Sequence, residues 1–208
     1  MDKMTRNSYL FKMSLPIFVE LLLQLLVGNI DQIMVSHYSQ ASVAAIVNGN
    51  QIMNIIIITM NMLSMATTVV LTQCLGAEDD HKSNQLCVLS MMVIGTVSVL
   101  STCVALFFNR PIFRLMNIDS AILHETCLYL MIVGGFSLVQ GLYLNFAAIL
   151  RSHTRLKEVM AVSILMNVLN IIGNAILING LFGFPRLGIV GAAISTVISK
   201  TIGLVCIY

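Results

Sequence analysis

Six apolar stretches dominate this chain and constrain its fold more than any other feature. They cover residues 14–36, 44–74, 86–108, 123–150, 159–182 and 187–208, with short polar segments between them. Each reaches the roughly 20 residues that a helix needs to cross the hydrocarbon core of a bilayer. Hydrophobic residues make up 58% of the chain and charged residues only 10%, which excludes an ordinary water-soluble domain. The sequence predicts an all-α membrane protein whose six transmembrane helices form one bundle over residues 1–208.

The distribution of basic residues predicts how the bundle is oriented. If the spans alternate in direction, the side of the N-terminus carries seven Lys and Arg residues: Lys3, Arg6, Lys12, Lys82, Arg151, Arg155 and Lys157. The opposite side carries Arg110, Arg114 and Arg186. Because cytoplasmic loops are enriched in Lys and Arg, we expect the N-terminus to be cytoplasmic. We expect a multi-pass protein of the plasma membrane, which in bacteria is the inner membrane. A net charge of only +2 argues against nucleic acid as a partner.

Two acidic residues lie inside the first apolar stretch, where a charge is costly and often marks a transport path. Glu20 and Asp31 are 11 residues apart, so they share one helical face with Gln24 and are separated by about 16 Å along the axis. We expect Asp31 to be functional, with a water-exposed position near the outer helix end as the alternative. Glu20 is a candidate for the lining of a cavity, and a structural role near the cytoplasmic end is equally open.

Amide side chains recur at helical spacing in three of the later stretches. The second has Asn50, Asn54 and Asn61 on the same face as Thr68 and Thr72, a pattern that favours a helix beside a wet cavity. The fifth has Asn167, Asn170 and Asn174, whose carbonyl oxygens can coordinate a cation or hold a carboxylate. The fourth adds Gln140, Tyr143 and Asn145 as cavity-lining candidates. The alternative for each single amide is a hydrogen bond that joins neighbouring helices.

Motifs of enzyme chemistry do not occur in the sequence. It has no glycine-rich phosphate loop, no His or Cys pair at metal-binding spacing, and no nucleophile with a base at motif spacing. We therefore expect neither an enzyme nor a bound cofactor. If the protein moves a solute uphill, an ion gradient must supply the energy.

Several ordered fragments give the chain a family resemblance. They are residues 28–35 (GNIDQIMV), 75–78 (LGAE), Tyr129 with Leu130, 149–155 (ILRSHTR), 167–177, 182–185 (FGFP) and 187–195 (LGIVGAAIS). In their order and spacing, the chain resembles the N-terminal six-helix half of a multidrug and toxic compound extrusion (MATE) transporter. The resemblance implies a twelve-helix protein of two lobes that exports cationic or amphipathic compounds in exchange for H⁺ or Na⁺. It also implies that this chain, at about half the family length, needs a C-terminal lobe or an equivalent partner half.

The resemblance also suggests a site for the coupling ion. Asp31 matches the first-span acid that binds the cation in this lobe, and Asn170 and Asn174 match fifth-span positions that join it. Many members have an aspartate where this chain has Asn174, so Asp31 is left as the titrating group of the site. Neutral amide oxygens around one carboxylate suit Na⁺ as well as a proton. Proton and sodium coupling therefore both stay open, with Na⁺ at Asp31 as the one metal site considered.

Three other functions compete with the drug antiporter. A lipid-linked oligosaccharide flippase of the same wider superfamily would favour a more basic cavity, whereas only Lys200 lies within a span here. An intramembrane prenyl or acyl transferase would need Asp-rich or His-containing motifs near the interface. A scaffold subunit without transport predicts that Asp31→Asn alters nothing except assembly.

Overall fold

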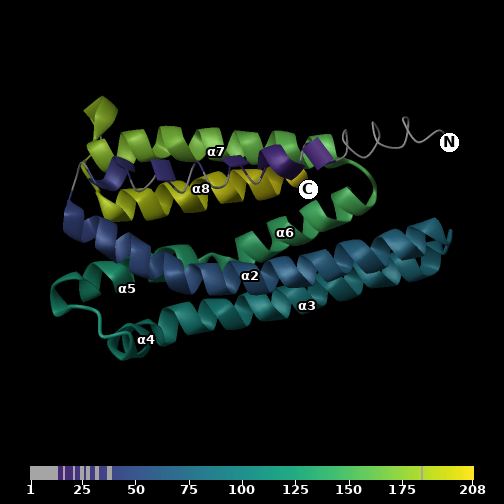
Figure 1. The fold of residues 1–208 in the computed structure, drawn as a ribbon, viewed down its shortest axis with the longest axis horizontal. Coiled ribbons are helices and arrows are strands. Elements are labelled where there is room, and N and C mark those ends of the chain that lie inside the picture. The colour runs from purple at the N-terminus through teal and green to yellow at the C-terminus, as the bar shows by residue number, and fades with distance from the viewer. Residues whose placement is uncertain are drawn as a thin grey trace.

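The structure is a computed structural model that describes residues 14, 15, 17–20, 22, 23, 26, 29, 30, 33–36, 39–183 and 185–208. Its elements are α2 (Gln40–Gly76), α3 (Asp80–Phe107), α4 (Asn109–Leu115), α5 (Ser120–Gly135), α6 (Ser137–Ser152), α7 (Leu156–Asn179), the 3₁₀ turn η1 (Leu181–Gly183) and α8 (Ile189–Ile207). These residues contain no strand (Figure 1), so the prediction of an all-α protein is confirmed. The described positions between 14 and 36 are helical as well, but Gln24 and Asp31 lie outside the described residues.

Four helices in the described part of the chain, α2, α3, α7 and α8, are long and apolar enough to cross a membrane. The α5 and α6 helices pass the same test together, as one span bent by 44°. With 37 residues, α2 extends for about 55 Å, longer than the roughly 30 Å hydrocarbon core, so it reaches beyond the bilayer. Its C-terminal end forms a long hairpin with α3 (Figure 1).

The bend between α5 and α6 divides the stretch that the sequence predicts as a single span over residues 123–150. It falls at Phe136, directly after Gly134 and Gly135, and the Ser137 hydroxyl donates to the Gly134 carbonyl oxygen at 2.6 Å. A Cβ atom on Gly134 would lie 2.5 Å from the Ala105 Cβ of α3. The glycine therefore allows α3 to approach the chain where the helix is interrupted.

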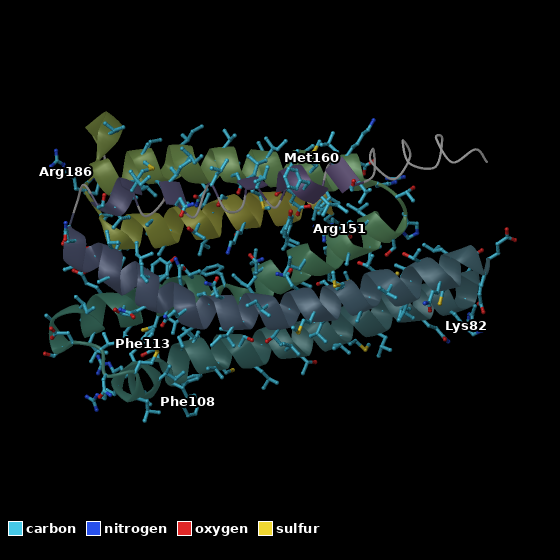
Figure 2. All side chains as sticks on the ribbon, in the orientation of Figure 1. Lys82, Phe108, Phe113, Arg151, Met160 and Arg186 are labelled. Carbon is cyan, nitrogen blue, oxygen red and sulfur yellow. The ribbon has the colours of Figure 1, made fainter. Side chains whose placement is uncertain are left out.

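The two ends of the bundle carry different basic residues. Figure 2 shows Lys82 at one end and Arg151 in the same half of the bundle, and Arg186 toward the other end together with Phe108 and Phe113 next to and within α4. The sequence analysis assigned these three basic residues to opposite sides in the same way. Which end faces the cytoplasm stays a prediction.

The hairpin of α7 and α8 is packed most closely where small residues face it. A Cβ atom on Gly191 would lie 2.7 Å from the Leu177 backbone oxygen, and one on Gly173 would overlap Ser195. Small residues let two helix backbones approach in a membrane, where burial of apolar surface gives little drive for association.

Large apolar side chains cover much of the outer surface. Phe107 is 75% exposed, Leu115 84%, Met65 72% and Val205 72%. Such a surface would be unusual on a soluble protein, and it is the surface that lipid or a second lobe covers in a membrane protein.

Candidate functional site

The candidate ion site centres on two asparagines of α7. The Asn174 Nδ2 atom donates to the Asn170 Oδ1 atom at 3.3 Å, one helical turn away. The Asn170 Nδ2 atom donates in turn to the Thr196 hydroxyl of α8 at 3.2 Å. Asn174 is fully buried and Asn170 is 5% exposed. The structure therefore brings these two predicted residues together in one hydrogen-bonded chain that crosses from α7 to α8.

Two residues of α8 contact α7 at this point, Ser195 at the backbone oxygen of Asn170 and Thr196 at its side chain. The Ser195 hydroxyl donates to the Asn170 backbone oxygen at 2.9 Å, and the Thr196 hydroxyl also donates to the Ala192 carbonyl at 2.9 Å. The sequence analysis did not identify Thr196. The available signal was its place next to Ser195, on the stretch of α8 that an antiparallel hairpin brings opposite Asn170.

The chemistry of this group is that of neutral oxygen ligands. A side-chain amide oxygen and a hydroxyl oxygen each have lone pairs that can coordinate a cation or accept a hydrogen bond from a protonated carboxyl group. Asp31, the predicted carboxylate of the site, and Gln24 lie outside the described residues. Within the ranges that the structure describes, no three His, Cys, Asp or Glu side chains gather at metal-binding distance.

Glu20 forms a buried ion pair with Arg151 at the C-terminal end of α6. The Arg151 Nη2 atom lies 2.8 Å from the Glu20 Oε1 atom, and the two side chains are 24% and 9% exposed. Arg151 stands in the last turn of α6, where the negative end of the helix dipole stabilises a cation. Sequence reasoning placed both residues near one membrane face, but a contact across 131 positions left no local signal.

The predicted polar residues of the fourth span are all buried on α6. Tyr143 is 3% exposed, Gln140 8%, and Asn145 is fully buried. Neither end of the Asn145 amide has a hydrogen-bond partner within the described residues, and the buried Tyr143 hydroxyl lies beside Ser163 without a hydrogen bond of normal geometry. On α7, Asn167 is half-buried, and its Nδ2 atom is buried and lacks a partner there too.

The asparagines of α2 are arranged differently from those of α7. The Asn50 Oδ1 atom accepts a hydrogen bond from the Tyr129 hydroxyl of α5 at 2.9 Å, which joins two helices. Asn54 and Asn61 are exposed on the outside of the bundle. Thr68, which the sequence places on the same face, donates to the Ser64 carbonyl and lies 3.4 Å from the Ala148 carbonyl oxygen.

Comparison with known proteins identifies the family. The MatE family model matches residues 16–176, which is most of the chain. An uncharacterized transporter of Bacillus subtilis, YisQ, is 39% identical over 196 residues, which cover 94% of this chain and 43% of the relative. A probable multidrug resistance protein NorM of Thermotoga maritima is 28% identical over 194 residues, which cover 93% of this chain and 42% of the relative.

A solved structure shows the same fold. A MOP superfamily transporter from Pyrococcus furiosus superimposes with a TM-score of 0.86 at 24% identity, over 94% of this chain and 42% of that one. The chain thus spans less than half the length of the proteins it matches, which corresponds to one lobe of such a transporter. The matched residues, the helical bundle and the half-length coverage agree: this chain belongs to the MATE family of membrane transporters, and its fold is that of the N-terminal six-helix lobe.

Proposed function

We propose that the protein is the N-lobe of a secondary antiporter that exports cationic or amphipathic compounds from a bacterial cell in exchange for H⁺ or Na⁺. The observation that carries this proposal is the buried chain of Asn174, Asn170 and Thr196. A buried amide in a membrane helix is costly unless it is hydrogen-bonded, and these three residues gather several oxygen atoms that can serve a cation at one point between two helices. Membership in a family of membrane transporters agrees with such a role for these residues.

Asp31 is the proposed binding group, and the α7 amides are its supports. A cation that approaches Asp31 would lose water, and the oxygen atoms of Asn170 and Asn174 can replace part of that hydration. With an asparagine at position 174, one carboxylate carries the charge change of the site. The coupling then requires that the cation bind one conformation of the lobe more tightly than the other, and that substrate affinity differ between the same two states.

The exposed face of α2 is the proposed wall of the substrate cavity. Asn54 and Asn61 stand among exposed Ile58, Met62 and Met65. A mixture of amides and flexible methionines suits amphipathic compounds, and a C-terminal lobe or partner half would close the cavity.

Dye efflux by the complete protein in membrane vesicles tests the proposal, with proton and sodium gradients imposed separately. One gradient should drive efflux, and Asp31→Asn should abolish the gradient-driven part. Asp119→Asn is the matched control. It makes the same chemical change at the exposed N-cap of α5, where asparagine caps a helix as well as aspartate does. Failure of both gradients to drive efflux in correctly inserted wild type would reject the antiporter and favour a flippase or scaffold.

A further inference from the structure

The inner face of α7 carries more polar residues than the candidate ion site uses. Ser163, Asn167, Asn170 and Asn174 follow one another at spacings of 4, 3 and 4, so they form a column along one helical face. Ser163 is 2% exposed, and the buried Nδ2 atom of Asn167 has no hydrogen-bond partner in the described structure. We call these four residues the α7 column.

The α7 column continues into α6 at the end of the bundle that carries Arg151. The Tyr143 hydroxyl is buried beside Ser163, and no hydrogen bond of normal geometry to a described residue satisfies it. The same hydroxyl lies within reach of the charges of Glu20 and Arg151. Polar groups therefore extend from Asn174 to the ion pair.

The spacing within the α7 column leaves room for bridges between its members. Residues one turn apart on a helix have Cβ atoms about 5 to 6 Å apart, whereas a hydrogen bond joins atoms about 3 Å apart. Asn170 and Asn174 close this gap directly, at 3.3 Å. The buried Asn167 Nδ2 atom has no such partner in the described structure, and one water molecule can bridge two polar atoms separated by about two hydrogen-bond lengths.

We propose that the α7 column, with Tyr143, holds a file of water molecules that connects the ion site to the membrane face at Arg151, and that the Glu20–Arg151 ion pair closes this path. The proposal rests on the proposed function, because it gives the coupling cation a route between Asn170 and the cytoplasm inside the N-lobe. The four column residues are uncharged, so water can pass them without displacing a bound counter-ion. The ion pair places opposite charges, mostly buried, where the path meets the face.

The ion pair is suited to act as the closure because its two charges compensate each other. Removal of the carboxylate would leave Arg151 mostly buried with an uncompensated charge, and such a group draws in water. Glu20→Gln keeps the size and hydrogen-bonding atoms of the side chain. Any gain in water access in this variant therefore comes from the lost charge.

Cysteine labelling of the complete protein in its membrane tests the path. In a background with all native cysteines replaced by alanine, Ser163→Cys and Asn167→Cys are each treated with a charged, membrane-impermeant thiosulfonate reagent. Intact cells and inside-out vesicles are compared. Arg155→Cys reports the sidedness of the Arg151 face, because that side chain is 62% exposed in the loop before α7. Ile164→Cys, on the outer face of the same helix, is the matched control.

We expect both column cysteines to react from the side on which Arg155→Cys reacts, and Ile164→Cys to stay unlabelled. Adding Glu20→Gln should speed the reaction at Ser163→Cys about tenfold, the scale of a modest shift between closed and open states. Exchange of the two charges, Glu20→Arg with Arg151→Glu, should restore slow labelling.

Three results would overturn the inference. The path is rejected if neither column cysteine reacts in either background while Arg155→Cys does, or if both react only from the opposite face. The gating role is rejected if labelling stays fast after the charges are exchanged. The labelling needs no drug substrate, so a failure of dye efflux and a failure of this path are separate results.

Discussion

The asparagines of α7 and those of α2 have the same helical spacing but different surroundings. Asn170 and Asn174 are buried and hydrogen-bonded to each other and to α8, whereas Asn54 and Asn61 face out of the bundle. Spacing alone predicts that residues share a face. It does not predict what that face contacts, which depends on the helix that packs against it.

The position of the α2 asparagines relative to the buried face explains the difference. Asn54 directly follows Met53 and Asn61 directly follows Met60, and both methionines belong to the buried face of α2. One residue turns the helix by 100°, so each asparagine stands at the edge of the packed face. Asn50 has the same relation to Gly49, but the Tyr129 hydroxyl reaches it from α5.

The largest effect on stability should come from the contact that brings α8 to the α7 amides. In Gly191→Leu, the new Cβ atom would meet the Leu177 backbone oxygen, which cannot move aside as a side chain could. We expect the free energy of unfolding to fall by about 3 kcal/mol, the upper part of the usual range for overpacking. Thermal unfolding in detergent measures it. Gly95→Ala on α3, which has open space around it, should be neutral or slightly stabilising, and equal losses in both variants would contradict the account.

Removal of the amide at position 170 should have the next largest effect. Asn170→Leu leaves the Asn174 amide without its acceptor and the Thr196 hydroxyl without a donor, so we expect a loss of about 1 to 3 kcal/mol in the free energy of unfolding. Asn170→Ser, which keeps a short polar group, should lose less. The same thermal measurement on both variants checks this order, and a fully stable leucine variant would show that the hydrogen bonds contribute nothing.

The exposed asparagines of α2 should behave in the opposite way. Asn61→Leu removes no hydrogen bond within the described lobe, so its free energy of unfolding should change by less than about 0.5 kcal/mol. Its dye selectivity in efflux assays should change, because the proposed cavity wall becomes more apolar. A large loss of stability would place Asn61 in a structural contact instead.

The smallest effect should be found at the loop between α2 and α3, far from both sets of asparagines. The Lys82 ammonium, 2.7 Å from the Asp79 Oδ2 atom, lowers the pKa of that carboxyl, together with the hydrogen bond from the Lys82 backbone nitrogen. A lowered folded-state pKa means that this stabilisation is present above the unfolded pKa of Asp79 and is lost as the pH falls through the folded value. Asp79→Asn keeps the helix cap and should remove only this acid-side dependence in thermal unfolding at a series of pH values. A pH dependence unchanged by the substitution would contradict the assignment.

Much of the fold could be predicted from the sequence because apolar runs of about 20 residues allow only spanning helices. The pairing of Asn170 with Asn174 could be predicted as well, since both lie on one helix. Thr196, the Glu20–Arg151 pair and the bend at Phe136 could not, because each depends on which helices pack together. The short helix α4 likewise lies between the predicted spans 86–108 and 123–150, where the sequence analysis predicted only a polar segment.

One paired measurement tests the central claim that the α7 amides serve the cation and the α2 amides serve the substrate. Asn170→Leu and Asn61→Leu are compared in the complete protein for dye binding without a gradient and for dye efflux with one. The account predicts that Asn170→Leu binds dye normally but no longer responds to the gradient, whereas Asn61→Leu responds to the gradient with altered dye affinity. If Asn170→Leu loses dye affinity and keeps its response to the gradient, the assignment of the two helices is wrong.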